Sequence, residues 1–251
     1  MKLIAQLGKF FLSGYYATIG TTASIVGIIL IFIPNPWAII FALTIVVVIL
    51  LWVFIKLINL LDSFFSNTTS EGYLKFATYC LYSTPDGNHV HYELHKFIQC
   101  KKLIMDSHKH EFKWSGTIDP KVTSTQQNFI RIIPAINKGE MDNAVLKFKK
   151  PLIYNEISLV EIIMDMDDSD HRSLKLVGHA VKETIHLLSF AVELKHLKTS
   201  KDARLCRRML NSATQQDIET IEFVKFDSTS RTYRYNLFNP EPGYHYRLDW
   251  S

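Results

Sequence analysis

The chain contains 251 residues, of which 47% are hydrophobic and 21% are charged, with 28 lysines and arginines against 24 aspartates and glutamates. This composition excludes a disordered chain and a collagen-like chain. No charged residue lies between Lys9 and Lys56. So long a stretch without charge indicates a membrane segment and excludes a free-standing soluble enzyme. The run is too short for more than two crossings, which also excludes a polytopic transporter.

The apolar run is predicted to form a two-helix transmembrane hairpin within residues 1–62. Pro34 and Pro36 divide the run, since proline lacks the backbone N–H group and disfavours a helical conformation in the residue before it. The two spans are predicted at about residues 12–33 and 37–60. Each is near the roughly 20 residues that a hydrocarbon core requires.

The cations that flank the spans predict their orientation. Lys2 and Lys9 precede the first span, Lys56 lies in the last part of the second, and the short loop between them has no cation. Because lysine and arginine concentrate on the cytoplasmic side of membrane proteins, both termini are expected to be cytoplasmic. A cleaved signal peptide is the alternative, and the length of the run and the presence of a second span disfavour it.

Small residues recur along the first predicted span at intervals of three and four, which places them on one face of a helix. They are Ser13, Ala17, Gly20, Ser24 and Gly27. Such a face allows close packing against the second span of the same chain. The alternative is a helix seam between copies of the chain, in which the first spans of a homo-oligomer, a tetramer or larger, line a pore.

After the hairpin, the sequence predicts a polar linker at residues 63–72 and a cytosolic β-rich domain at residues 73–251. Short segments with alternating hydrophobic residues, separated by turn-forming residues, predict its strands. These are residues 73–82, 89–98, 111–114, 129–133, 144–148, 158–166, 173–177, 184–194, 219–226, 232–238 and 244–250. The pattern predicts a β-sandwich or a β-barrel, and therefore a membrane protein of the α+β class.

One segment of the domain departs from strand-like alternation. Residues 197–217 are rich in helix formers and predict a short helical insertion, or an ordered loop between strands. Elsewhere in the domain, Cys80, Cys100 and Cys206 are odd in number and far apart. This arrangement is typical of a reducing compartment and not of a disulfide framework.

Two clusters raise the question of a metal site. Asp165, Asp167, Asp168 and Asp170 offer carboxylates, but the spacing of a calcium-binding EF-hand is not met, and a charged hairpin turn is the preferred interpretation. Alternating histidines offer nitrogen ligands, but no acidic or cysteine partner completes a set, and solvated strand histidines are preferred. They are His89, His91 and His95, followed by His108 and His110. No catalytic motif is present, so we expect no enzymatic activity, no metal and no cofactor.

A basic face is the candidate ligand site. Arg204, Arg207 and Arg208 have the spacing i, i+3 and i+4, which would direct three guanidinium groups from one helix face towards phosphate oxygens. Further basic residues are interleaved with aromatic residues, a composition suited to phosphate contact and base stacking. They are Lys147, Lys149, Lys150, Arg231, Tyr233, Arg234 and Tyr235. A solvated charged surface is the alternative interpretation.

Two sequence segments carry a resemblance to a known group. These are Phe-Lys-Trp-Ser-Gly at residues 112–116 and Pro-Gly-Tyr-His-Tyr-Arg-Leu-Asp-Trp at residues 242–250, which look like a β-sandwich module that accompanies bacterial conflict systems. With two spans ahead of a β-rich cytosolic domain, the chain resembles two-transmembrane anti-phage effectors of cyclic-oligonucleotide and Hailong-type defence. The Gly-Thr-Trp opening of the two-span β-barrel effectors is absent, and the resemblance assigns no functional residue.

The resemblance implies a membrane effector of the bacterial inner membrane that forms an oligomeric ion channel or a membrane-disrupting pore. A cyclic or linear oligonucleotide, made by a partner nucleotidyltransferase, would bind the cytosolic domain and set the state of the pore. The alternative is a two-pass anchor for a β-sandwich that binds a protein partner and forms no pore. An anchored hydrolase with an unrecognised site is a third hypothesis.

Overall fold

The computed structural model describes residues 20, 21, 24, 27, 36–66, 69, 71–137, 140–210 and 218–250. The chain divides into two compact units, Met1–Thr68 and Thr69–Ser251. The first predicted span, with Ser13 and Ala17, the cations before it and the Pro34 break lie outside the described residues. Within that span, Gly20, Thr21, Ser24 and Gly27 are described and are helical.

Helix α3 (Pro36–Ser66) contains the second predicted span. Proline is tolerated at its first position because the N–H group that proline lacks has no partner there in any helix. The segment Ile39–Leu61 is long and apolar enough to cross a membrane, and its side chains are largely exposed. The helix continues to Ser66, so the first residues of the predicted linker are helical.

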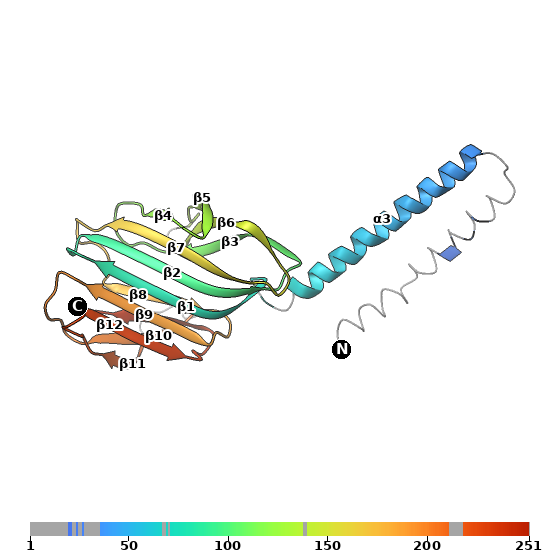
Figure 1. The fold of residues 1–251 in the computed structure, drawn as a ribbon. Coiled ribbons are helices and arrows are strands. Elements are labelled where there is room, and N and C mark those ends of the chain that lie inside the picture. Colours follow the sequence, from blue (N-terminus) through green and yellow to red (C-terminus); the bar gives the residue numbers. More distant parts are fainter. Residues whose placement is uncertain are drawn as a thin grey trace. The chain divides into compact units, whose positions relative to one another are not determined.

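The β domain contains thirteen strands in the part of the chain that the structure describes (Figure 1). They are β1 (Tyr73–Thr84), β2 (His89–Cys100), β3 (Ile104–Phe112), β4 (Lys121–Thr123), β5 (Gln127–Ile133), β6 (Asp142–Ile153), β7 (Ile157–Asp167), β8 (Leu176–Val181), β9 (Leu187–Leu194), β10 (Ala203–Met209), β11 (Glu219–Val224), β12 (Thr232–Phe238) and β13 (Tyr244–Asp249). Each of the predicted strands overlaps one of these. The prediction missed β4 and β10.

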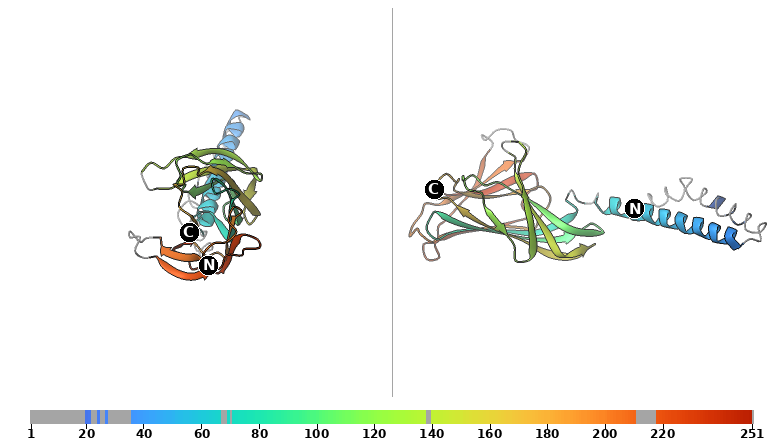
Figure 2. Two further views of the ribbon diagram at one scale, coloured as in Figure 1. Left: turned by 90° about the vertical axis from the view of Figure 1, so that its left-hand side faces the viewer. Right: turned by 90° about the horizontal axis from the view of Figure 1, so that it is seen from above.

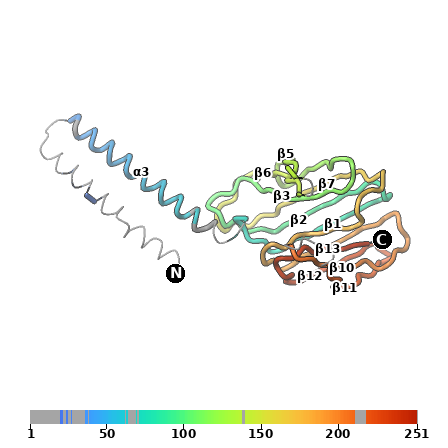
Figure 3. The backbone as a smooth tube through the Cα atoms, turned by 180° about the vertical axis from the view of Figure 1, so that it is seen from behind, coloured from blue at the N-terminus to red at the C-terminus, as the bar shows by residue number. Residues whose placement is uncertain are grey.

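The strands form three sheets. A six-stranded sheet has the order β12-β9-β1-β2-β7-β4, a four-stranded sheet the order β11-β10-β13-β8, and a three-stranded sheet the order β3-β6-β5. All neighbours are antiparallel except β1 and β9, which are parallel. In the view of Figure 3, β3, β5 and β6 lie on one side of β1 and β2, and β10, β11 and β13 lie on the other.

One hydrophobic core joins the three sheets, whose curved layers Figure 2 shows from the end and from above. Strand alternation builds it, because every second side chain of a strand points to the same face. In β2, Val90, Leu94 and Ile98 are buried, and in β6, Ala144 and Leu146 are buried. Cys80, Cys100 and Cys206 are buried as free thiols.

The predicted helical insertion is wrong where the structure describes it, because residues 203–209 form strand β10 between β11 and β13. The pairing with β11 contains a bulge between Leu205 and Cys206, and both residues are buried. Two consecutive buried residues interrupt the alternation that marks a strand. Pairing with two neighbours outweighs the helix propensity of the segment.

Candidate functional site

A cavity of about 780 Å³ lies within the β domain and is the candidate ligand site. Its walls come from strands of all three sheets, chiefly β1, β2, β3, β8 and β13. Strand alternation explains the composition of the β2 wall, since Tyr92 and Lys96 share the buried face with Leu94. The volume is within the roughly 300–1,000 Å³ of small-molecule sites.

Lys96 is the central charged residue of the cavity wall. It is only 4% exposed, and its Nζ atom lies 3.1 Å from His110 Nδ1. Burial, followed by repulsion from Lys75, lowers the pKa of Lys96 to about 7. No carboxylate of the described residues forms a salt bridge with Lys96, which is therefore a buried basic group without a neutralising partner.

Three histidines line the same cavity. His108, His110 and His179 are buried, and burial together with the nearby positive charge of Lys96 holds each pKa well below its ordinary value. In the described part of the chain, neither ring nitrogen of His108 has a hydrogen-bond partner. The interpretation of His108 and His110 as solvated strand histidines is therefore wrong: β3 directs both towards the interior.

A second lysine, Lys75, connects the cavity to the segment that precedes β1. Its Nζ atom lies 2.9 Å from Glu71 Oε2, and the lysine side chain is almost fully buried. Burial tends to raise the pKa of Glu71, but Lys75 and a hydrogen bond with Tyr73 outweigh it and hold that pKa at about 2. Glu71 is ionised at neutral pH and compensates Lys75.

The cavity also reaches Arg208, His245 and Arg247 on β10 and β13. Arg247 pairs with Asp249 at 2.9 Å, yet its Nε atom has no hydrogen-bond partner among the described residues. The same is true of the Trp114 Nε1 atom. Buried donors without partners carry a free-energy cost that a bound acceptor would remove.

The charges and rings of the wall favour an anionic ligand that contains a ring. Eight lysines and arginines line the cavity, against two glutamates, and both glutamates are already paired, Glu71 with Lys75 and Glu111 with Lys182. Phosphate and carboxylate oxygens are the groups that such donors bind most strongly. Aromatic residues offer faces for stacking. These are Tyr73, Tyr82, Tyr92, Phe112 and Trp114.

The three arginines of the predicted basic face do not form one face. Arg204 lies 3.9 Å from Asp249, and Arg207 is neutralised by Glu219 at 2.7 Å and by Glu241 at 3.0 Å. Only Arg208 lines the cavity. The prediction of a shared helix face is wrong because β10 is a strand. Successive side chains of a strand alternate between two faces, so residues i, i+3 and i+4 cannot all lie on the same one.

The other predicted ligand residues are scattered over the domain. Lys147, Lys149 and Lys150 are exposed on β6, where Lys149 Nζ donates to the Thr125 carbonyl at 2.6 Å. Arg231 lies in the turn before β12 and donates to the Lys195 carbonyl. Arg234 is exposed on β12. None of them lines the cavity.

The two tyrosines of β12 are not placed to stack on a ligand beside Arg234, as the sequence predicted. Tyr233 is 0% exposed, and its hydroxyl donates to Ser200 Oγ at 2.6 Å. The hydroxyl of Tyr235 donates to Glu222 at 2.6 Å. Both occupy the strand face opposite to Arg234, so they do not combine with it into a stacking platform.

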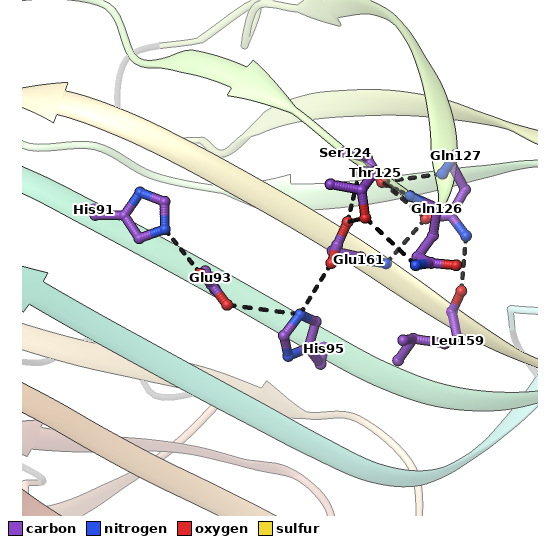
Figure 4. A network of polar contacts seen from close by, with 9 residues as sticks. All are labelled: His91, Glu93, His95, Ser124, Thr125, Gln126, Gln127, Leu159 and Glu161. Atoms are coloured by element: carbon purple, nitrogen blue, oxygen red, sulfur yellow. Dashed lines mark hydrogen bonds and ion pairs between the residues drawn. The ribbon is translucent and has the colours of Figure 1, made fainter.

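A second polar network lies on the outer face of β2 and β7 (Figure 4). The Glu93 carboxylate lies between two imidazoles, 2.8 Å from His91 Nε2 and 3.7 Å from His95 Nε2. His95 also lies 3.3 Å from Glu161, whose other oxygen accepts two hydrogen bonds from Thr125. The network fastens the segment between β4 and β5 to the six-stranded sheet.

The acidic cluster spans the end of β7, which contains Asp165 and Asp167, and the start of the connection to β8, which contains Asp168 and Asp170. Because β7 and β8 belong to different sheets, the cluster is not a hairpin turn. Its carboxylates accept hydrogen bonds: Asp168 from Ser173 and Asp167 from the Ser169 N–H, both donors within the connection, and Asp170 from Thr117, which is distant in sequence. Among the residues that the structure describes, no group of three or more histidine, cysteine or acidic side chains is arranged to hold a metal ion.

The cavity residues were missed because they are far apart in sequence. Lys75, Lys96, His108 and His179 lie on four different strands. One local signal was present: Lys96 lies between Leu94 and Ile98 in the set of every second residue that forms the buried face of β2. A lysine in the buried register of a strand indicates either an error in the register or a charged interior.

The comparisons with known proteins name no family. No family model and no curated protein matches the chain. An M1 zinc metallopeptidase from Deinococcus radiodurans is similar at TM-score 0.41 and 9% identity, over 71% of this chain and 42% of that chain. Yeast LTA4 hydrolase is similar at TM-score 0.35 and 10% identity, over 73% and 30%. The chain spans less than half the length of either, and these similarities are too low to indicate a shared family or function.

Proposed function

We propose that the β domain is a receptor for an anionic, ring-containing ligand of the nucleotide class, which binds in the interior cavity. The observation that carries the proposal is Lys96, a buried lysine without a carboxylate partner in the described chain, in a cavity with eight cationic residues and two paired glutamates. A buried unpaired base costs stability. An anionic ligand that pairs with Lys96 would remove this cost, and the free energy regained would contribute to binding.

A nucleotide would use more of the groups on the cavity wall than a simple anion would. Phosphate oxygens would accept hydrogen bonds from Lys96, from Arg208 and from His108, whose ring nitrogens have no partner among the described residues. A base would stack on tyrosine or tryptophan rings, a contact worth about 1–3 kcal/mol per base. An inorganic anion would use only the first set of groups and leave most of the cavity unfilled.

Glu71 supplies a route from the cavity to the membrane segment. It lies between α3 and β1, and its carboxylate holds Lys75 at 2.9 Å on the cavity wall. A ligand phosphate competes with Glu71 for Lys75, because both are anions that seek the same ammonium group. Binding would therefore release the connecting segment from the wall, and loss of the ligand would restore it.

The chain as a whole is, in this proposal, a membrane effector of bacterial defence. The predicted two-span hairpin would assemble through the first spans into an ion channel or membrane-disrupting pore, and the ligand would set its state. The support comes from the apolar helix α3, the basic cavity and the resemblance in the order of parts.

Calorimetry of the full chain in nanodiscs, against a panel of cyclic and linear oligonucleotides, tests the ligand. Lys96→Met should lower the affinity about tenfold to a hundredfold, since one charge-assisted contact is worth roughly 1.5–3 kcal/mol. Lys147→Met is the matched control, because Lys147 is exposed and outside the cavity. Equal loss in both variants would indicate diffuse attraction and would contradict the cavity as the site.

Glu71→Gln tests the route to the membrane segment. It removes the competing charge, so the affinity for the ligand should rise and the membrane activity should shift towards the ligand-bound state. Unchanged affinity would show that Glu71 does not compete. The effect on cells would show the direction of control. If loss of the ligand makes the protein toxic to cells, the ligand inhibits the pore, and if loss of the ligand protects cells, the ligand activates it.

The alternative is a membrane anchor for a β domain that binds a protein partner. It becomes the better proposal if the unmodified chain binds no nucleotide of the panel. In that case removal of the spans should change the location of the protein and leave its partner binding intact.

A further inference from the structure

Four large apolar side chains are exposed at one end of the β domain. Ile104 is 66% exposed, Ile153 59%, Ile157 60% and Tyr154 38%. Ile104 is the Cα partner of Ile153 across β3 and β6, and Ile157 lies opposite Gln99 on β2. Two cations adjoin them in the loop between β2 and β3. We name the set the basal patch, and it consists of Lys101, Lys102, Ile104, Ile153, Tyr154 and Ile157.

The basal patch lies where the chain enters the β domain. Tyr73, the first residue of β1, is the Cα partner of Cys100, the last residue of β2. The Lys101 N–H donates to the Gly72 carbonyl at 2.9 Å. Gly72 has a φ angle of 77°, and a side chain there would collide with Lys102. The last residue of the connection from α3 therefore contacts the patch directly.

The length of the connection limits how far the patch can be from the end of α3. Ser66 ends the helix and Tyr73 begins β1, and the seven intervening chain steps reach about 25 Å when fully extended. α3 contains the segment that is long and apolar enough to cross a membrane. If α3 crosses a bilayer, a connection of this length brings the patch within reach of the lipid headgroups.

The composition of the patch fits the interfacial region of an anionic bilayer. Isoleucine favours the boundary of headgroups and acyl chains, tyrosine the headgroup level, and lysine the anionic phosphates. Lys101 Nζ lies 5.4 Å from the centre of the Tyr154 ring and donates to Asn155 Oδ1 at 2.7 Å. Glu156, in the same turn, directs its carboxylate to the Ile153 N–H, at 3.0 Å.

We propose that the basal patch docks on the membrane surface, with its isoleucines in the headgroup region and its lysines on anionic lipid. The inference rests on α3 crossing the bilayer and needs no ligand in the cavity, although Lys102 belongs both to the patch and to the cavity wall. Docking would fix the β domain against the membrane instead of leaving it on a free tether.

A polarity-sensitive fluorophore on Ile157→Cys, in the full chain reconstituted into vesicles, tests the proposal. The three native cysteines are buried, so the introduced thiol is the reactive one, and the unmodified chain gives the background. Ser228→Cys, in an exposed turn between β11 and β12, is the matched control. The vesicles are phosphatidylcholine alone or with one third phosphatidylglycerol.

Docking predicts blue-shifted emission at residue 157 and quenching by nitroxide-labelled lipid, stronger with phosphatidylglycerol, and neither effect at residue 228. Lys101→Glu with Lys102→Glu should reduce the anionic-lipid dependence, since each lysine near such a surface changes the docking equilibrium about fivefold. Aqueous emission at residue 157 in both vesicles would overturn the proposal. So would a blue shift without lipid quenching, which would indicate that a second copy of the chain covers the patch.

Discussion

Replacing Lys96 with methionine should stabilise the ligand-free β domain at neutral pH, although it removes a hydrogen bond from the interior. Lysine has a pKa of 10.5 in the unfolded chain, and that of the folded Lys96 is about 7. The unfolded chain therefore binds this proton much more tightly than the folded protein does. At pH 7 the difference lowers the free energy of unfolding by about 4 kcal/mol. Methionine has a similar length and avoids this cost.

The sign of the pH dependence follows from the depressed pKa of a base. Between pH 7 and 10.5 the unfolded chain binds the proton and the folded protein does not, so the stability of the unmodified protein rises with pH. At pH 10 the cost of burying Lys96 is only about 1 kcal/mol. The advantage of Lys96→Met should thus shrink by about 3 kcal/mol from pH 7 to pH 10. The lost contact with His110 subtracts roughly 1 kcal/mol at both values.

Urea unfolding of the full chain in mild detergent, followed by near-ultraviolet circular dichroism, measures the difference. The titratable groups near Lys96 are common to both proteins, so their titrations cancel to first order; they are Glu71, Lys75, Cys80 and Glu111. Burial holds the pKa values of His108, His110 and His179 well below the ordinary value, so these histidines stay neutral from pH 7 to 10 in the folded state. Lys147→Met, at an exposed position, should change little at any pH. A stability difference between Lys96→Met and the unmodified chain that is constant from pH 7 to 10 would refute the reasoning, as would a destabilised variant at pH 7.

Three further predictions concern topology, assembly and the ligand. Cysteine at Asn35 should react with an impermeant thiol reagent in intact cells; protection there together with labelling of the C-terminus would reverse the orientation. Gly20→Leu or Gly27→Leu should weaken the oligomer seen by size-exclusion chromatography with light scattering, because leucine obstructs close helix contact, and unchanged size and activity would leave only packing within the chain. A Cβ built on either glycine meets no heavy atom of the described chain within 4 Å. Arg208→Ala should lower ligand affinity about tenfold in calorimetry and Arg204→Ala should not, since Arg208 lines the cavity and Arg204 does not; equal effects would argue for a diffuse basic surface.

The sequence alone determined the features that depend on local pattern. The absence of charge from residue 10 to residue 55 predicts a membrane segment, and α3 contains a stretch that is long and apolar enough to cross a bilayer. Alternation located most strands, since one face of each strand is buried. The same rule failed at β10, where the bulge between Leu205 and Cys206 interrupts the alternation. The sequence spacing of Arg204, Arg207 and Arg208 there also matches one face of a helix.

Only the tertiary structure decided the cavity. Alternation says that Lys96 and Leu94 share a face of β2, but not which face of which strand lies opposite. His108 and His110 alternate on β3 as His91 and His95 do on β2, yet the first pair is buried and the second lies on the outer face with Glu93 and Glu161. The difference depends on how the sheets pack together, which is non-local. Local sequence pattern therefore indicates that a histidine lies on one face, and packing determines whether that face meets solvent or the interior cavity.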